Sequence, residues 1–173
     1  MNISVVFIII VGLKNSGKTT LGTALSKIFV KRGYSVGAVK GMPHHDFTHE
    51  LENSDTHRYS EAGADLVLAH SNNGLLNTKT KEEIDNLVDV FQECDVVICE
   101  GLNLPGATAS LVCLERGEDI SKVWKVRGDF IEPLAFSGKV AKTMKVLLGK
   151  PVYDPLDDME MDALADLLIQ FRH

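Results

Sequence analysis

Residues 12–19 read Gly-Leu-Lys-Asn-Ser-Gly-Lys-Thr and match the phosphate-binding pattern G-x-x-x-x-G-K-[ST] at every fixed position. Glycines let such a loop wrap closely around phosphate oxygens, and its backbone N–H groups form an anion nest at a helix start. We expect Lys18 to reach the β- and γ-phosphates, Thr19 to ligate Mg²⁺ and Thr20 to lie near the α-phosphate. The predicted nucleotide-binding residues are Gly12, Lys14, Asn15, Ser16, Gly17, Lys18, Thr19 and Thr20.

Lys14 is the member of this set with the least defined role, because it fills a variable position of the pattern. It is either a solvated loop residue or a lysine that reaches across a dimer. Dimeric proteins that use a second lysine carry it directly after the first glycine, where this chain has Leu13.

A phosphate-bound Mg²⁺ also needs an acidic partner at the end of a second strand. The apolar run 95–99 ends at Glu100, and ligands of α/β sheets bind at the carboxyl ends of strands. Glu100 is therefore the predicted catalytic carboxylate and, with Thr19, a predicted metal ligand; the alternative is a solvated carboxylate at a strand end. Asp46, in the segment after the strand predicted at 36–39, is the second acidic candidate for the metal.

The segment 44–57 concentrates imidazole and carboxylate groups: His44, His45, Asp46, His49, Glu50, Asp55 and His57. These groups ligate divalent metals, and the spacing of His45 and His49 suits two ligands on one helix face. Pro43 and Phe47 instead favour an irregular loop. Metal binding, substrate binding and a solvated loop are three open interpretations of this segment.

Apolar patterning indicates which elements position these groups. Strands are expected at 3–11, 36–39, 65–69, 95–99, 111–114, 130–136 and 150–153, and helices at 19–32, 55–62 and 157–171. A further helix, carrying Ile84, Leu87, Val88 and Phe91, is expected after a capping box formed by Thr80 and Glu83. The alternation predicts an α/β fold, a P-loop NTPase-like three-layer sandwich with a mostly parallel sheet.

Length, charge and cysteine usage limit the classes of protein. A chain of 173 residues predicts a single domain over 1–173. With 18 Lys and Arg against 24 Asp and Glu, the net charge of −6 argues against nucleic acid or an anionic membrane as partners. The longest apolar run, 5–11, is shorter than the roughly 20 residues of a membrane span. Cys94, Cys99 and Cys113 form no C-x-x-C pair, which favours a reducing cytoplasm. Cys99 and Cys113 lie in apolar runs and are expected to be core residues.

Several segments taken together resemble the MobB family of molybdopterin-guanine dinucleotide biosynthesis proteins over nearly the full length. They are the loop 12–20, Lys40 followed closely by His-His-Asp-Phe at 44–47, Asp-Thr-His-Arg-Tyr-Ser-Glu-Ala-Gly-Ala at 55–64, the strand 95–101 ending in Cys-Glu-Gly, and the end from Tyr153-Asp154 through the closing helix. The chain departs from the family pattern in the Gly-Met-Pro after Lys40, where a histidine is usual, and at Asn53, where glycine is common.

The resemblance implies a homodimeric protein that binds GTP with Mg²⁺ and is at most a slow GTPase. It also implies partnership with the guanylyltransferase that joins GMP to molybdopterin, while direct binding of molybdopterin stays open. Carried onto this chain, residues 12–20 would hold phosphates and Glu100 would serve the metal. Asp46, Asp55 and Arg58 would line the loop face, with His44 and His45 in the same substrate or partner loop.

Two other functions compete with this one. A nickel metallochaperone GTPase would explain the histidines, but the cysteine-proline-histidine motif of that class is absent from the sequence. A small-molecule P-loop kinase would need a cluster of lid arginines, whereas Arg32, Arg58, Arg116, Arg127 and Arg172 are scattered. The guanine-binding pattern [NT]-K-x-D is also absent, since Thr80-Lys81-Glu82-Glu83 lacks the aspartate. GTP as the nucleotide therefore follows from the resemblance.

Overall fold

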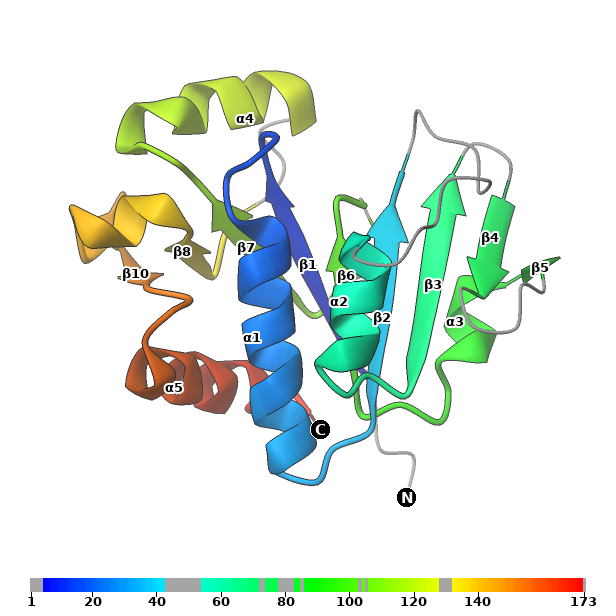
Figure 1. Ribbon diagram of the computed structural model, residues 1–173. Helices are drawn as coiled ribbons and strands as arrows, with labels where there is room; N and C mark the ends of the chain where they lie inside the picture. The colour runs from blue at the N-terminus through cyan, green and yellow to red at the C-terminus, as the bar shows by residue number, and fades with distance from the viewer. Residues whose placement is uncertain are drawn as a thin grey trace.

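The strands of the protein join one mixed sheet (Figure 1). The computed structural model describes residues 5–42, 54–71, 74–77, 83–84, 86–102, 104, 106–127 and 132–172. In this part of the chain the sheet has ten strands in the order β5-β4-β3-β2-β6-β1-β7-β8-β10-β9. Neighbours from β3 to β10 pair in parallel, and β4, β5 and β9 pair antiparallel at the two edges. The strands are β1 Val6–Gly12, β2 Val36–Gly41, β3 Leu66–Ser71, β4 Gly74–Asn77, β5 Glu83–Ile84, β6 Val96–Glu100, β7 Ala109–Cys113, β8 Ala135–Ser137, β9 Val146–Leu147 and β10 Lys150–Tyr153.

Helices cover both faces of this sheet. The helices α1 (Lys18–Lys31), α2 (Asp55–Glu61) and α5 (Asp158–Ile169) pack on one face, and α3 (Leu87–Val90) and α4 (Ile120–Arg127) pack on the other. Short 3-10 turns span Gly117–Asp119 and Lys139–Lys142. The predicted three-layer α/β sandwich is confirmed. Among the described helices, none combines the length and apolar character that crossing a bilayer requires.

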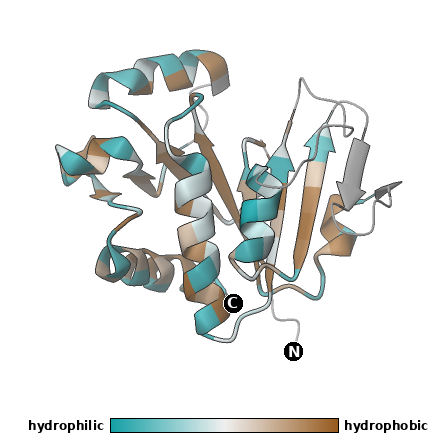
Figure 2. Ribbon diagram, viewed as in Figure 1, coloured by the Kyte–Doolittle hydropathy of each residue, from teal (hydrophilic) through white to brown (hydrophobic). Residues whose placement is uncertain are grey.

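The central strand β1 is buried on both sides, as its continuous apolar run predicts. Ile8 and Ile10 pack with Leu21 and Leu25 of α1, whereas Ile9 belongs to a cluster on the opposite face. Figure 2 shows the result as brown along the central strands and teal on much of α2. Burial of β1 between two helical layers fixes the strand whose end carries the phosphate-binding loop.

The helix predicted from Thr80 and Glu83 does not begin there. Glu83–Ile84 instead form β5, which pairs with β4, a strand that the sequence did not indicate. The helix begins at Leu87, because the Asn86 side chain accepts hydrogen bonds from the N–H groups of Val88 and Asp89 at 3.0 and 3.5 Å. This cap leaves a single helical turn, and it exposes Val88, which the helical pattern had placed on the apolar face.

Helix α4 is an element that the sequence analysis missed. Its apolar residues Ile120, Val123 and Trp124 pack against the sheet at helical spacing, but the segment is only eight residues long. Its apolar stripe was therefore too short to stand out from the polar residues around it.

Gly138, which follows β8, brings the chain against the phosphate-binding loop. Its φ is 98°, a conformation open mainly to glycine. A Cβ at this position would lie 2.3 Å from the carbonyl oxygen of Ser16 and 2.7 Å from that of Leu114. The backbone at the end of β8 is thus in direct contact with the backbone of the phosphate-binding loop, and this contact holds the loop in position.

We expect Gly138→Ala to lower the free energy of unfolding by about 3 kcal/mol, because backbone strain of ~1–3 kcal/mol adds to overpacking of similar size. Urea denaturation followed by circular dichroism measures the change. Gly149→Ala is the matched control: Gly149 has a φ of 73°, but no atom of the described residues lies within 4 Å of the added Cβ. It should lose only about 1 kcal/mol. Equal losses in the two variants would contradict a tight contact between Gly138 and the loop.

Candidate functional site

The phosphate-binding loop connects β1 to α1 at the carboxyl edge of the parallel strands. Asn15 and Gly17 both have positive φ, at 61° and 100°, so the chain curls before the helix begins. Helix α1 has 14 residues and begins at Lys18, and its N-cap residue Gly17 provides no side-chain cap, the arrangement that binds anions at a helix N-terminus. The Lys18 Nζ donates to the carbonyl oxygens of Gly12 and Leu13, at 3.2 and 2.7 Å, so the ammonium lies folded over the loop. These donors fit a phosphate group.

Ser16 contributes a buried hydroxyl within the loop. Ser16 is 2% exposed. In the part of the chain that the structure describes, Ser16 Oγ has no hydrogen-bond partner. A buried polar atom without a partner costs about 1–3 kcal/mol, so this hydroxyl favours a water or ligand atom beside it.

Glu100 is the centre of a hydrogen-bond cluster at the same edge. It ends β6 and has no exposed surface. Its Oε1 accepts from Thr19 Oγ1 at 2.9 Å and from Lys40 Nζ, and its Oε2 accepts from the Tyr59 hydroxyl at 2.9 Å. Lys40 and Glu100 are register partners on β2 and β6, which places them side by side. A buried carboxylate is tolerated only when donors replace the lost water, and three donors do so here.

Tyr59 reaches this cluster from α2. It stands four residues after Asp55, so both side chains lie on one face of the helix. The Tyr59 side chain is fully buried against α1, where a Cβ on Gly22 would lie 1.9 Å from its hydroxyl oxygen. Burial, followed by the negative charge of Glu100, raises the pKa of Tyr59 well above its ordinary value. Tyr59 is therefore a permanent donor to Glu100 at any physiological pH.

Lys40 links the cluster to the start of α2. Its Nζ also bonds to Asp55 Oδ2 at 2.7 Å, and Asp55 in turn faces Arg58 at 3.6 Å. Burial acts to lower the pKa of Lys40, but the charge of Glu100 and the hydrogen bond to Asp55 outweigh it, so this pKa lies above the ordinary value. Burial likewise raises the pKa of Asp55, and the hydrogen bond and charge of Lys40 reverse this and lower it. Both groups of the pair are charged at neutral pH.

The donor set beside the loop fits a nucleotide-bound magnesium ion. The Thr19 hydroxyl and the Glu100 carboxylate are hard oxygen ligands, and Mg²⁺ usually takes one or two protein oxygens while phosphates and waters complete its shell. The described residues contain no group of three or more His, Cys, Asp or Glu side chains that could hold a metal ion by themselves. The arrangement thus suits an ion that arrives with phosphate.

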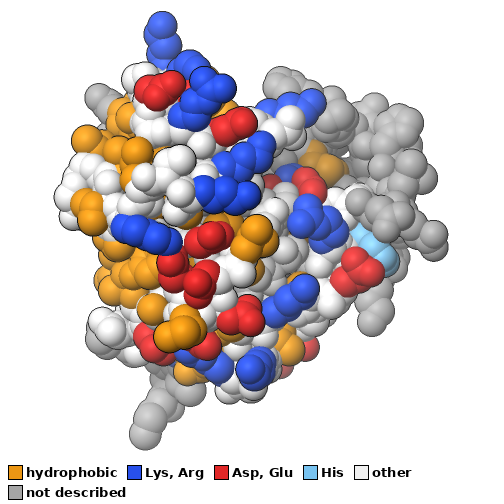
Figure 3. Space-filling view, turned by 60° about the vertical axis from the view of Figure 1, so that its left-hand side comes forward, with side chains coloured by type: hydrophobic (Ala, Val, Ile, Leu, Met, Phe, Trp, Pro, Cys, Tyr) orange, Lys and Arg blue, Asp and Glu red, His pale blue; other side chains and the backbone are white. Residues whose placement is uncertain are grey.

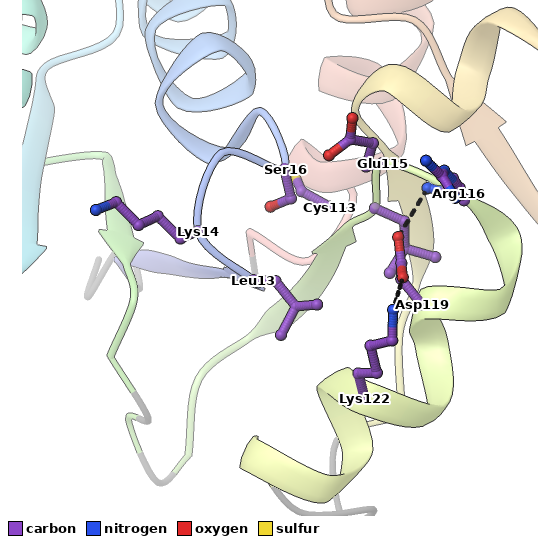
Figure 4. Close-up of a pocket in the computed structure, with 9 residues that line it drawn as sticks. Leu13, Lys14, Ser16, Cys113, Glu115, Arg116, Asp119 and Lys122 are labelled. Atoms are coloured by element: carbon purple, nitrogen blue, oxygen red, sulfur yellow. Dashed lines mark hydrogen bonds and ion pairs between the residues drawn. The ribbon is translucent and has the colours of Figure 1, made fainter.

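A cavity of about 280 Å³ borders the outer wall of the loop (Figure 4). It lies between Leu13 and Ser16 on one side and the segment from β7 into α4 on the other. On that wall Asp119 Oδ1 accepts from Lys122 Nζ at 2.7 Å, and its Oδ2 accepts from the Arg116 N–H at 3.2 Å. Acidic and basic side chains are similarly interspersed over the face in Figure 3. This face thus carries a mixture of both charges rather than one positive patch.

The structure brings some of the predicted site residues together and leaves others apart. Thr19, Glu100 and Asp55 meet around Lys40, and Arg58 lies at the rim of that cluster. Thr20 lies in the first turn of α1, and the Lys14 side chain points away from the charged wall of the cavity (Figure 4). His44, His45, Asp46 and His49 lie outside the described residues.

Lys40 and Tyr59 are site residues to which the sequence analysis gave no role. Both fall in the segments that carried the family resemblance, and both have sequence signals. Lys40 closes a buried strand, as Glu100 does, and Tyr59 follows Asp55 at helical spacing. Neither signal indicated a partner, because the order of the strands and the seating of α2 were unknown.

Comparisons with known proteins identify the family and the fold. The family described as molybdopterin guanine dinucleotide synthesis protein B (MobB) matches residues 7–108, more than half of the 173 residues. A probable molybdopterin-guanine dinucleotide biosynthesis adapter protein of Bacillus subtilis is 28% identical over 157 residues, covering 88% of this chain and 87% of the relative. The crystal structure of Bacillus subtilis MobB superposes with a TM-score of 0.56 at 22% identity, covering 96% of this chain and 98% of that one. HypB from Helicobacter pylori in complex with nickel gives 0.59 at 18% identity, covering 96% and 86%, and shows a shared fold.

We expect Tyr59→Phe to lower the free energy of unfolding by about 1.5–3 kcal/mol, because a buried charged acceptor loses one donor. Urea denaturation at neutral pH measures this loss. Tyr34→Phe is the control, since the Tyr34 ring packs edge-on against Phe29 and beneath Arg172, away from Glu100. That change should stay within about 0.5 kcal/mol. A Tyr59→Phe protein as stable as the control would show that Glu100 does not depend on the hydroxyl.

Proposed function

The chain belongs to the MobB family of molybdopterin guanine dinucleotide synthesis proteins, and we propose that it serves this synthesis as a nucleotide-binding adapter. The role in molybdenum cofactor synthesis that the sequence resemblance implied is thereby confirmed. The observation that carries the nucleotide-binding part is the meeting of three groups at one sheet edge. They are Lys18 over the phosphate-binding loop, Thr19 at the start of α1 and Glu100 at the end of β6.

We propose that the nucleotide is GTP and that Mg²⁺ accompanies it. Residues 12–20 would cradle the phosphates, with Lys18 turning from the loop carbonyls to the phosphate oxygens. Thr19 and Glu100 would hold the metal, which when bound neutralises phosphate charge. The preference for guanine rests on the family and on the adapter name of the relative.

Hydrolysis by this site is proposed to be slow at most. Both oxygens of Glu100 accept hydrogen bonds from Thr19, Lys40 and Tyr59, so the carboxylate is organised to hold charge rather than to take up a proton. The Arg58 guanidinium forms an ion pair with the Asp55 carboxylate, 3.6 Å away, so its charge is directed to Asp55 rather than to a phosphoryl group. We propose that the bound nucleotide controls whether the protein presents a surface to its partner, and that the partner performs the chemistry.

The proposed partner is the guanylyltransferase that attaches GMP to molybdopterin. We further propose a homodimer, a single domain over residues 1–173 and a cytoplasmic location, where three free buried cysteines would stay reduced. We also propose that the segment containing His44 and His45 contacts molybdopterin directly. The nickel metallochaperone alternative has only the shared fold with HypB behind it.

Lys18→Ala should lower the affinity for GTP by roughly 100-fold or more, because charge-assisted hydrogen bonds to phosphate are worth about 1.5–3 kcal/mol each. The thermal midpoint of the nucleotide-free protein should change little, since the ammonium pairs with carbonyls rather than packing in the core. Isothermal titration with GTP and with ATP, in Mg²⁺, measures affinity and base preference together.

The control is Lys27→Ala, which removes an exposed lysine from the same helix. It should bind GTP like the unaltered protein. Normal binding by Lys18→Ala would refute the assignment of the loop, and tighter binding of ATP than GTP would refute the proposed nucleotide.

The purified guanylyltransferase should bind the protein with a dissociation constant in the range of about 1–10 μM, typical of transient partners. Surface plasmon resonance with GTP, with GDP and without nucleotide measures the dissociation constant in each state. No binding in any of the three states, by a protein that binds GTP, would refute the adapter role.

A further inference from the structure

Lys40 is the feature of the site that nucleotide binding alone does not explain. Its side chain is 15% exposed and its partner Glu100 is 1% exposed. Among the described residues, the other lysines in ion pairs, at positions 122, 139, 145 and 150, keep 38–66% of their side chains exposed. A long, strongly hydrated ammonium is thus held inside the protein at the carboxylate that a metal ion would use.

Lys40 and a divalent cation would compete for one place. Lys40 Nζ and Thr19 Oγ1 both donate to the same oxygen, Oε1 of Glu100. An ion held by Thr19 and Glu100 would stand within a few ångströms of the ammonium, and two cations at that separation repel strongly in a buried site. The Thr19–Glu100 bond can persist beside a metal, because the hydroxyl has lone pairs left to offer. Lys40 has no lone pair and must withdraw.

We propose that Lys40 is the resident cation of the metal-free site and leaves Glu100 when the metal–nucleotide complex binds. The inference rests on the proposed function, since in the unaltered protein the ion that displaces Lys40 arrives with the phosphates of the nucleotide. In the absence of that ligand, Lys40 keeps Glu100 neutralised, so that the buried carboxylate does not destabilise the fold. The four-carbon stem of lysine lets the ammonium move without a change in β2.

Withdrawal of Lys40 from Glu100 would loosen the attachment of α2 to the site. Two ties join the start of this helix to Glu100: the Lys40 bridge to Asp55 at 2.7 Å and the Tyr59 hydroxyl bond at 2.9 Å. When Lys40 leaves Glu100, only the Tyr59 tie remains. Lys40 is therefore a positioning residue: binding of the metal changes how firmly α2, with Asp55 and Arg58, is held at the site.

The first test uses the full chain and MgCl₂ without nucleotide, and thermal unfolding is the readout. Removal of the ammonium leaves the buried charge of Glu100 uncompensated, so in the variant Mg²⁺ can pair with this carboxylate even without phosphate. The unaltered protein should keep nearly the same midpoint on addition of Mg²⁺. Lys40→Met should unfold at a lower temperature and recover with millimolar Mg²⁺, but not with NaCl of equal ionic strength. Lys145→Met, which removes the exposed partner of Glu160, is the matched control and should not respond to Mg²⁺. A Lys40→Met protein whose midpoint ignores Mg²⁺ would overturn the proposal.

The second test measures GTP affinity across a Mg²⁺ titration, starting from EDTA. Lys40→Met should need about tenfold less Mg²⁺ than the unaltered protein for the half-maximal effect of the metal on GTP affinity. Lys40→Arg keeps the charge in a firmer, planar donor and should need more Mg²⁺. The arginine variant also decides the matter if the methionine variant does not fold.

Two results would contradict the proposal in this arm. A shift of the Mg²⁺ requirement in the same direction for both variants would indicate a packing effect. A Mg²⁺ requirement of Lys40→Met equal to or above that of the unaltered protein would show that Lys40 does not compete with the metal. Failure of the proposed function is distinguishable, because it would appear as absent GTP binding by the unaltered protein while the Mg²⁺ arm still reports on Lys40.

Discussion

A carboxylate sealed from solvent is the constraint on which the nucleotide edge of this protein depends. Glu100 is held by Thr19 from α1, Lys40 from β2 and Tyr59 from α2, so each neighbouring element supplies one donor. Removing the charged partner of a buried ion pair costs about 3–5 kcal/mol, so Glu100 depends most on Lys40, and the two hydroxyl donors add to this stabilisation. These side chains are consequently in place before a ligand binds, so the free energy needed to order them is part of folding rather than of binding.

Parallel pairing makes this assembly possible. The strands β2, β6, β1 and β7 run in one direction, so Lys40, Glu100, Gly12 and Cys113 all finish at one edge of the sheet. The phosphate-binding loop follows β1, which lies between β6 and β7. The hydrogen-bond cluster around Glu100 lies on one side of the loop and the cavity on the other. The acidic side chains in the cluster and at the cavity are each paired with nearby lysines. A chain of net charge −6 can therefore still hold an anion in the loop.

The sequence predicted the parts of the site that obey strong local rules. The run before Gly12, the loop itself and the strand before Glu100 needed only periodicity and a motif, and each element was found within a few residues. Lys40 and Tyr59 were not assigned roles, because their functions depend on register and on the packing of α2 against α1. The start of α3 was misplaced for a similar reason, since Asn86 competed with an upstream capping pattern and a strand pairing decided the outcome.

The contact between Tyr59 and Gly22 has an evolutionary consequence. A side chain of any size at position 22 would occupy the volume of the Tyr59 hydroxyl, so the two positions can vary only together. A descendant that gained alanine on this face of α1 would have to shorten residue 59 and lose the donor on Glu100 Oε2. Its buried acid would then have to recruit another donor or be replaced. One missing methyl group on a helix thus restricts the mutational paths open to an acidic residue on another strand.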